Sequence, residues 1–181
     1  MNFVVLGLGS NKSWQGMSSV QLLVQAVRAL GVVLRSITCS SVYRTRPLYV
    51  EDQDDFLNMV VAGDVDDSLS PHDLLISTQH IEASLGRDRT MEYENGPRTI
   101  DIDIELFDSR QVRTDDLEIP HPRIHERAFV LVPLLEILGK SADTKDSAFS
   151  ARAADYARML DAIGSDGVQK VLDAEIFAKS V

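Results

Sequence analysis

The sequence predicts an α+β fold, a ferredoxin-like sandwich in which helices pack on one face of an antiparallel sheet and extra helices follow at the C-terminus. Three observations predict it. Short apolar or alternating runs, typical of strands, are interspersed with segments whose apolar residues recur at helical spacing. These elements come in the order strand, helix, strand, strand, helix, strand, which is the split β-α-β arrangement. From residue 139 onward the pattern changes to amphipathic helical segments.

The chain begins with a strand and an amphipathic helix. Residues 3–8 are apolar and end in a glycine-rich turn, which predicts a strand. Residues 18–30 carry apolar side chains at helical spacing, with Ser18 or Ser19 as the N-cap. We expect Gly31 to end this helix.

The middle of the chain supplies two more strands and a second helix. Residues 32–43 are rich in β-branched side chains and residues 56–65 are largely apolar, so both are predicted to be extended. A polar loop, residues 44–55, separates them. Ser70 is then a suitable N-cap for a helix that we expect to stop at Gly86.

The fourth predicted strand, residues 99–107, alternates strictly between apolar and acidic side chains. Apolar side chains take one parity and carboxylates the other, and successive side chains of a strand point to opposite faces. Neighbouring like charges on one face repel, and burying them costs more. One face is therefore predicted to carry Ile100, Ile102, Ile104 and Leu106, and the other Asp101, Asp103 and Glu105.

The C-terminal part is predicted to be helical. Residues 128–138 are apolar and predict an extended piece followed by a helical turn, whereas residues 147–164 and 168–179 have amphipathic helical patterns. We expect a single domain over residues 1–181, with 139–181 as a helical segment whose role the sequence does not assign.

Composition limits the possible partners and compartments. The chain has 181 residues, with 28 acidic against 18 basic residues and a formal net charge of −10, which argues against a nucleic-acid or anionic-membrane binder. Its one cysteine, Cys39, allows no intrachain disulfide. There is no signal-peptide pattern and no apolar run long enough to cross a bilayer, so the expected location is the cytoplasm.

The acidic strand has the pattern of a metal–polyphosphate site. Asp101 and Asp103 project in parallel from the strand, and Mg²⁺ prefers a few carboxylates together with waters and phosphates. Basic residues gather nearby, at Arg87 and Arg89 upstream and around Arg127 downstream, and guanidinium groups suit phosphate oxygens. A solvated strand face and surface ion pairs remain alternatives from these residues alone.

The motifs also carry a resemblance to a known family. The chain resembles the 6-hydroxymethyl-7,8-dihydropterin pyrophosphokinases of folate biosynthesis over residues 4–138. The matching pieces, in the family's order and spacing, are LGLGSN, SSVYRTRPLYVEDQDDFLNMVV, TQHIEASLGRDR, GPRTIDIDIELFD and IPHPRIHERAFVLVPLLEI.

This resemblance implies a ferredoxin-like fold and one reaction, a Mg²⁺-dependent transfer of pyrophosphate from ATP to the hydroxymethyl oxygen of the reduced pterin, which releases AMP. Two Mg²⁺ ions are expected between Asp101, Asp103 and the triphosphate, with Arg87 and Arg89 on a loop that closes over the phosphates. The implied partners are the pterin and ATP, with no nucleic acid or membrane, and protein partners are not assigned.

The resemblance also implies the contacts of each substrate. Nucleotide-side positions carry over to Gln79, Glu82, Arg89, Arg98, Ile104, His121 and Arg127. Pterin-side positions carry over to Thr45, Pro47, Leu48, Phe56, Asn58 and Phe129, of which the two aromatics are expected to sandwich the ring and the amide to pair with its edge.

Departures from the family pattern and rival readings stay open. Asn95 stands where tryptophan is frequent, Tyr49 where glycine is common, Pro122 where an aromatic is often found, and Glu105 where an apolar side chain is usual.

A different Mg²⁺-dependent phosphotransferase, or a ligand-sensing module, is a rival function. The pterin-side residues disfavour the first, and the aspartate pair disfavours the second. The loop over residues 87–95 is expected to be mobile without ligands.

Overall fold

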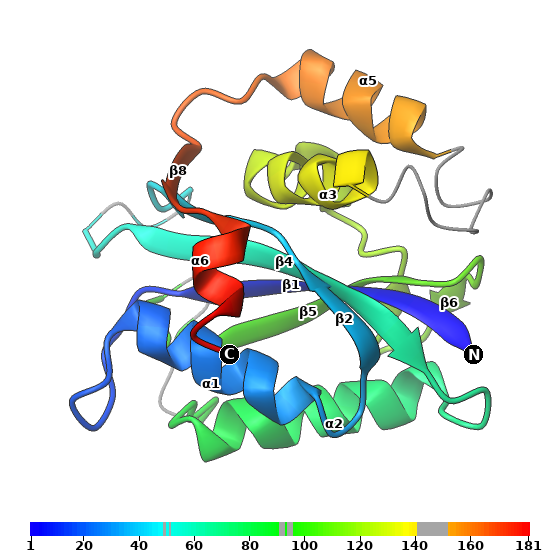
Figure 1. The fold of residues 1–181 in the computed structure, drawn as a ribbon, viewed down its shortest axis with the longest axis horizontal. Coiled ribbons are helices and arrows are strands. Elements are labelled where there is room, and N and C mark those ends of the chain that lie inside the picture. Colours follow the sequence, from blue (N-terminus) through cyan, green and yellow to red (C-terminus); the bar gives the residue numbers. More distant parts are fainter. Residues whose placement is uncertain (49, 51, 91–92, 94–95, 141–151) are drawn as a thin grey trace.

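A computed structural model describes residues 1–48, 50, 52–90, 93, 96–140 and 152–181 (Figure 1). The strands are β1 (Asn2–Ser10), β2 (Arg35–Cys39), β3 (Val42–Thr45), β4 (Phe56–Val65), β5 (Asp101–Phe107), β6 (Val112–Arg113), β7 (Glu118–Ile119) and β8 (Gln169–Leu172). The helices are α1 (Ser19–Leu30), α2 (Pro71–Ser84), α3 (Ala128–Lys140), α5 (Ala153–Ile163) and α6 (Ala174–Ala178), with a 3₁₀ turn at Ile124–Glu126.

The main sheet has the strand order β5-β1-β4-β3-β8, and β2 pairs with β4 beyond the end of β3. The named pairings within it are all antiparallel. The predicted extended piece over residues 32–43 is thus two strands along β4, separated by Ser40 and Ser41. The Ser40 hydroxyl accepts the Val60 N–H at 2.9 Å. The predicted α+β fold with its split β-α-β order is confirmed.

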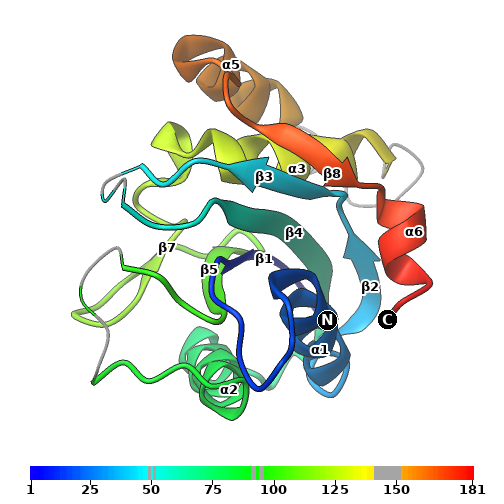
Figure 2. The same cartoon turned by 90° about the vertical axis from the view of Figure 1, so that its left-hand side faces the viewer.

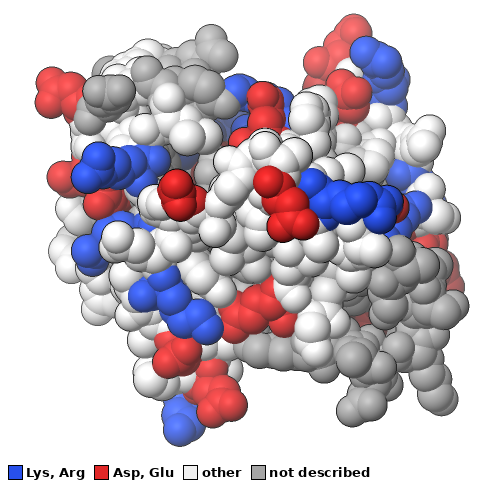
Figure 3. Space-filling view, turned by 90° about the horizontal axis from the view of Figure 1, so that it is seen from above, with Lys and Arg blue, Asp and Glu red and all other residues white. Residues whose placement is uncertain are grey.

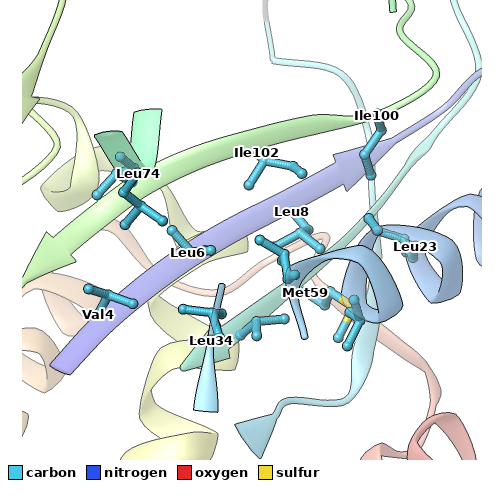
Figure 4. Packing of buried hydrophobic residues seen from close by; sticks show 14 of the residues in the cluster. Val4, Leu6, Leu8, Leu23, Leu34, Met59, Leu74, Ile100 and Ile102 are labelled. Atoms are coloured by element: carbon cyan, nitrogen blue, oxygen red, sulfur yellow. The ribbon is translucent and has the colours of Figure 1, made fainter. Parts of the chain in front are cut away.

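Helices lie on both faces of the sheet, as Figure 1 shows. The two crossover helices, α1 and α2, cover one face, as predicted, and the core between them and the sheet is apolar. Figure 4 shows part of that core, where Leu6 and Leu8 of β1 lie near Leu23 of α1 and Leu74 of α2. The other face is covered by α3 and α5, which pack with Val5, Val60, Ala62 and Leu106 of the sheet.

The predicted ends of the first two helices are confirmed. Ser18 caps α1 in a reciprocal arrangement with Gln21, and Gly31 follows the last residue of the helix. Ser70 caps α2 in the same way with Asp73. Such caps satisfy backbone N–H groups that have no partner within the helix.

The prediction of an extended piece at the start of residues 128–138 is wrong, because α3 is helical from Ala128 to Lys140. Pro133 lies inside it and removes one backbone donor, so this helix forms in spite of a residue that disfavours a helix interior. The helix lies between the sheet and α5, so that it buries apolar side chains toward both. A helix that is apolar on most sides shows little amphipathic period in its sequence.

The helical prediction for residues 168–179 is also wrong in its first half, where Gln169–Leu172 forms β8 and only Ala174–Ala178 is helical. Figure 2 shows β8 alongside β3, with which it pairs in antiparallel fashion. The unpaired backbone of an edge strand offers hydrogen bonds that a helical pattern does not reveal. The predicted helix over residues 147–164 corresponds to α5, and residues 147–151 lie outside the described residues.

The C-terminal residues are tied into the structure by buried contacts. Phe177 of α6 is fully buried in the core on the α1 side of the sheet. Arg28 of α1 donates to the carbonyls of Ser180 and Val181 at 2.8 and 3.0 Å, and the Ala174 N–H donates to the Ser41 hydroxyl at 3.1 Å.

One face of the molecule mixes both signs of charge. On the face seen in Figure 3, Lys and Arg side chains are interspersed with Asp and Glu side chains, unlike the continuous basic surface that a phosphate backbone requires. Within the described ranges, no helix combines the length and the apolar character that a bilayer crossing demands.

If the C-terminal segment is part of the core, Phe177→Ala should lower the free energy of unfolding by about 3–5 kcal/mol, as for other buried aromatics. Its neighbour Ile176 is 54% exposed, and Ile176→Ala should change the same quantity by no more than about 0.5 kcal/mol. Urea denaturation measures both. Equal effects of the two substitutions would contradict the burial of Phe177.

Candidate active site

The two aspartates of β5 face glycines on the neighbouring strand. Asp101 lies opposite Gly9 and Asp103 opposite Gly7 in the β1–β5 register. Both carboxylates line a pocket, here called the main pocket, on the sheet face that carries α3. The side chains of Asp101 and Asp103 are 22% and 35% exposed, so both remain accessible from this pocket.

A β-bulge interrupts the alternation predicted for β5. Leu6 pairs with Ile104 and Val5 with Leu106, which leaves Glu105 without an opposite residue. The prediction that Leu106 shares a face with Ile104 is therefore wrong, because Ile104 packs toward α1 and α2 whereas Leu106 packs toward α3. An extra residue in one strand shifts the parity of everything after it.

Two arginines neutralise Asp101. Arg98 donates to one carboxylate oxygen at 2.7 Å, and Arg87 donates to the other. Burial opposes ionisation of this carboxyl, but the guanidinium groups of Arg87 and Arg98 outweigh it and hold the pKa of Asp101 below its usual value. Asp101 is therefore an anion that is held by Arg87 from the loop after α2 and by Arg98 from the loop before β5.

Asp103 is held by a different arginine. Arg127 donates to its Oδ2 at 2.9 Å, and His121 Nε2 lies 3.9 Å from the same oxygen. Burial and the negative charge of Asp101 raise the pKa of Asp103 to about 6. Burial and the charge of Arg127 lower the pKa of His121 to about 4, so this histidine is neutral at pH 7 and can accept from Arg127.

Glu105 is the third carboxyl on this side of the strand and is fully buried. Neither carboxyl oxygen has a hydrogen-bond partner within the described part of the chain. Burial, then the charge of Asp103, raises the pKa of Glu105 to about 8. It occupies space above Gly7, where a Cβ atom would lie 2.8 Å from its Oε1, so a side chain at position 7 would displace the carboxyl.

Glu82 of α2 binds the loop that follows its own helix. Its carboxylate accepts from Arg87 at 2.5 Å, from Arg89 at 2.6 Å and from the Ile102 N–H at 2.8 Å. The side chain is 1% exposed, and burial raises its pKa. The possibility that Glu82 is a solvated surface residue is therefore excluded, and it joins α2, the arginine loop and β5.

The predicted pterin-side residues line the main pocket together. They are Thr45, Pro47, Leu48, Phe56, Asn58 and Phe129. The Asn58 amide donates to the Thr45 hydroxyl at 2.7 Å, which leaves its carbonyl oxygen as an acceptor. Guanidinium groups lie over both aromatic rings, with Arg98 5.6 Å from the centre of Phe56 and Arg127 5.6 Å from that of Phe129.

A second pocket, here called the helix pocket, lies at the end of α2. Its lining includes Gln79, Glu82, Arg87 and Arg89 from the predicted nucleotide side. Arg87 also reaches Asp101 in the main pocket, so one side chain connects the two. Arg98 and Arg127, assigned to the nucleotide as well, line the main pocket.

Not every predicted residue reaches a pocket. Ile104 is 4% exposed and packs in the core between the sheet and the crossover helices. His121 does not line either pocket and reaches the site through Arg127, with 3.4 Å between its Nε2 and Arg127 Nη1. The departures at Tyr49 and Asn95 lie outside the described residues, as does part of the loop over residues 87–95.

Sequence reasoning missed Asn11, which joins two loops of the site. Its amide donates to the Gln53 side chain and to the Asp54 carbonyl, both at 3.0 Å, and its Oδ1 accepts the Arg98 N–H at 2.9 Å. It is 5% exposed. The signal was the Asn that ends LGLGSN, since a buried amide directly after a strand needs several partners.

The aspartate pair fits a magnesium ion better than a metal held by protein alone. In the described ranges, His, Cys, Asp and Glu side chains form no group of three that could hold a metal. Asp101 and Asp103 are two oxygen donors in a pocket flanked by Arg98 and Arg127. Mg²⁺ usually takes one or two carboxylates and completes its shell with waters and phosphates, and arginines are suited to the same phosphates.

Comparisons with known proteins agree on one family. Residues 5–139 match the family model described as 7,8-dihydro-6-hydroxymethylpterin-pyrophosphokinase. A 2-amino-4-hydroxy-6-hydroxymethyldihydropteridine pyrophosphokinase of Bacillus subtilis is 42% identical over 136 residues, covering 75% of this chain and 78% of that protein. The protein of the same name from Methylorubrum extorquens is 44% identical over 139 residues, covering 76% of this chain and 83% of its own length.

Larger proteins match as well, and the chain spans only part of them. The mitochondrial folate synthesis bifunctional protein of Pisum sativum is 39% identical over 78% of this chain, which is 26% of that protein. The wild-type HPPK-DHPS of Plasmodium falciparum with STZ-DHP superposes with a TM-score of 0.61 at 15% identity, covering 93% of this chain and 46% of that one. At that identity the likeness supports the fold alone.

Replacing Glu82 tests the joint between α2, the loop and β5. Glu82→Ala leaves two arginines and a backbone N–H without this acceptor, and should lower the free energy of unfolding by about 3 kcal/mol or more, as when a buried ion pair is broken. His80→Ala, on the exposed side of the same helix, should stay within about 0.5 kcal/mol of the unsubstituted chain. A similar loss from both, measured by denaturant titration, would exclude a special role for Glu82.

Proposed function

Because the chain belongs to the 7,8-dihydro-6-hydroxymethylpterin-pyrophosphokinase family, we propose that it transfers the β,γ-pyrophosphoryl group of ATP to the hydroxymethyl oxygen of 6-hydroxymethyl-7,8-dihydropterin. The products are AMP and the pterin diphosphate, an intermediate of folate biosynthesis. The observation that carries the proposal is the main pocket, whose lining brings together two aromatic residues, a buried amide and a pair of aspartates.

The pterin binds in the main pocket. Its flat ring stacks between Phe56 and Phe129, which come from different elements and line the same space. The Asn58 carbonyl oxygen accepts from the ring edge, because the Thr45 hydroxyl already takes one of its amide hydrogens. Pro47 and Leu48 close the apolar side of the pocket.

Asp101 and Asp103 would hold two Mg²⁺ ions together with the triphosphate. When bound, the ions neutralise phosphate charge and orient the phosphate groups for an in-line displacement. The chain's own contribution is to keep Asp101 ionised beside Arg87 and Arg98, and to present both carboxylates to the pocket that holds the attacking hydroxyl.

The nucleotide extends from the aspartates toward the helix pocket. Arg87 lines that pocket and contacts Asp101, so phosphates placed there meet a guanidinium group that is already oriented. Arg89 and Gln79 line the same pocket and add donors for the nucleotide. Arg98 and Arg127 donate to phosphate oxygens from the pterin side, and His121, neutral beside Arg127, keeps that guanidinium in place.

This activity requires one domain and no membrane. The tail beyond residue 139 contributes β8 to the sheet and Phe177 to the core, which supports one domain over residues 1–181. We infer that the chain acts in the cytoplasm, because ATP and the pterin are both small water-soluble molecules.

The nucleotide product tests the reaction. With ATP, Mg²⁺ and hydroxymethyl-dihydropterin, the protein should release AMP in a one-to-one ratio with pterin diphosphate, because the bond broken lies between the α- and β-phosphates. Anion-exchange chromatography separates the nucleotides. Release of ADP would indicate single phosphoryl transfer, and either that result or no turnover would refute the proposal.

Asp103→Ala tests the metal assignment. Turnover should fall by at least about a hundredfold, the scale of losing one group that stabilises developing charge, while the pterin still binds in calorimetry because the aromatic pair and Asn58 are unchanged. Asp161→Ala, on the exposed side of α5, is the charge-matched control and should retain full turnover. Undiminished turnover of Asp103→Ala would remove Asp103 from the metal site.

A further inference from the structure

Glu105 is the one carboxyl of β5 that the proposed reaction leaves without a task. It stands at the bulge, with no residue opposite it on β1, and its side chain lines the main pocket. Gly7 leaves the room that its carboxyl fills, since Oε1 lies 2.8 Å from where a Cβ would be. The bulge and the glycine together direct a fully buried acid into the site.

The carboxyl lies close to one cation without bonding to it. Arg127 Nη1 is 4.0 Å from Glu105 Oε1, which is too long for a hydrogen bond. Both oxygens of Glu105 and the Nε of Arg127 are buried without a hydrogen-bond partner among the described residues. Buried polar groups in this state cost free energy unless a change in geometry gives them partners.

Arg127 thus lies between two carboxyls. In this structure its Nη1 donates to Asp103 at 2.9 Å, with the neutral His121 at 3.4 Å. Its guanidinium also lies over Phe129, one wall of the main pocket. Any group that draws Arg127 away from this place would also disturb that wall.

We propose that Glu105 is a positioning residue, whose carboxyl replaces Asp103 as a hydrogen-bond acceptor of Arg127, beside the phosphate oxygens, when Asp103 turns to a metal ion. The inference rests on the proposed function, in which Asp103 is a ligand of Mg²⁺. If the ion took Asp103 Oδ2, the oxygen that now accepts from Arg127, that guanidinium would lose its present carboxylate acceptor. Glu105 Oε1 and Arg127 Nη1, now 4.0 Å apart, would need to approach one another by about an ångström to form the replacement bond.

The role follows from the acceptor oxygen and not from its charge. An amide at position 105 would fill the same space above Gly7 and still accept from Arg127, whereas an aliphatic side chain of similar size would fill the space without accepting. Glu105→Gln and Glu105→Leu therefore separate positioning from packing.

The experiment measures how strongly the two substrates help one another to bind. Hydroxymethyl-dihydropterin is titrated calorimetrically into each variant, with and without Mg²⁺ and α,β-methylene-ATP, whose bridging carbon prevents transfer. Without metal and nucleotide, all three proteins should bind the pterin alike, since Asp103 still holds Arg127. With them, Glu105→Leu should bind about tenfold more weakly than the unsubstituted chain, the worth of one charged hydrogen bond, and Glu105→Gln should bind as the unsubstituted chain does.

Three results would overturn the inference. Equal affinities of all variants in the presence of metal and nucleotide would show that Arg127 needs no second acceptor. An equal loss in both conditions would mean that Glu105 acts on the pocket by packing. Failure of Glu105→Leu to bind Mg²⁺ and the analogue would make Glu105 a metal ligand instead.

A crystal structure of the unsubstituted chain with Mg²⁺ and the same analogue tests the inference without any substitution. Arg127 should then lie within about 3.2 Å of a Glu105 oxygen, and an Arg127 that leaves Glu105 would refute the positioning role. If the unsubstituted chain bound neither the pterin nor the metal–nucleotide pair, the proposed function itself would fail, a result distinct from binding without coupling.

Discussion

The structure depends on placing carboxyl groups side by side on one strand. Asp101, Asp103 and Glu105 occupy alternate positions of β5. Their mutual repulsion is offset only where positively charged side chains approach from outside the strand. The arginines that do so come from the loop after α2, the loop before β5 and the turn before α3. Those three connections are held in place by the carboxylates that their arginines neutralise. The conformation of these loops and the electrostatics of the site therefore depend on each other.

Structural features were predictable from the sequence where neighbouring residues along the chain determine them. Caps such as Ser18 and Ser70, and the limits of β4, follow from neighbouring residues and were predicted correctly. Tertiary contacts decided the errors. Pro133 lies within a helix because both sides of α3 are covered, and residues 169–172 form a strand because β3 offers them an edge. The periodicity of the sequence reveals neither the covering of α3 nor the free edge of β3.

The site divides in the same way. The aspartate pair, the aromatic pair and Asn58 were found from motifs, and they line one pocket. The bulge at Glu105 was not, because strict alternation in sequence is what an unbroken strand would also produce. Only the register with β1 reveals that Leu106 has changed faces. Asn11 escaped notice for a related reason, since its partners are far away along the chain.

The two edges of the main sheet are protected in different ways. On the β5 side, Glu82 accepts the Ile102 N–H and the Glu105 carbonyl accepts the His121 N–H, so side chain and loop occupy groups that another strand might use. On the opposite side, the tail itself becomes the last strand, a short one that carries Lys170. Short, charged borders of this kind discourage sheets of separate molecules from joining. A chain cut before β8 would instead present the backbone of β3 to its neighbours, and self-association could then arise without any change in the pockets.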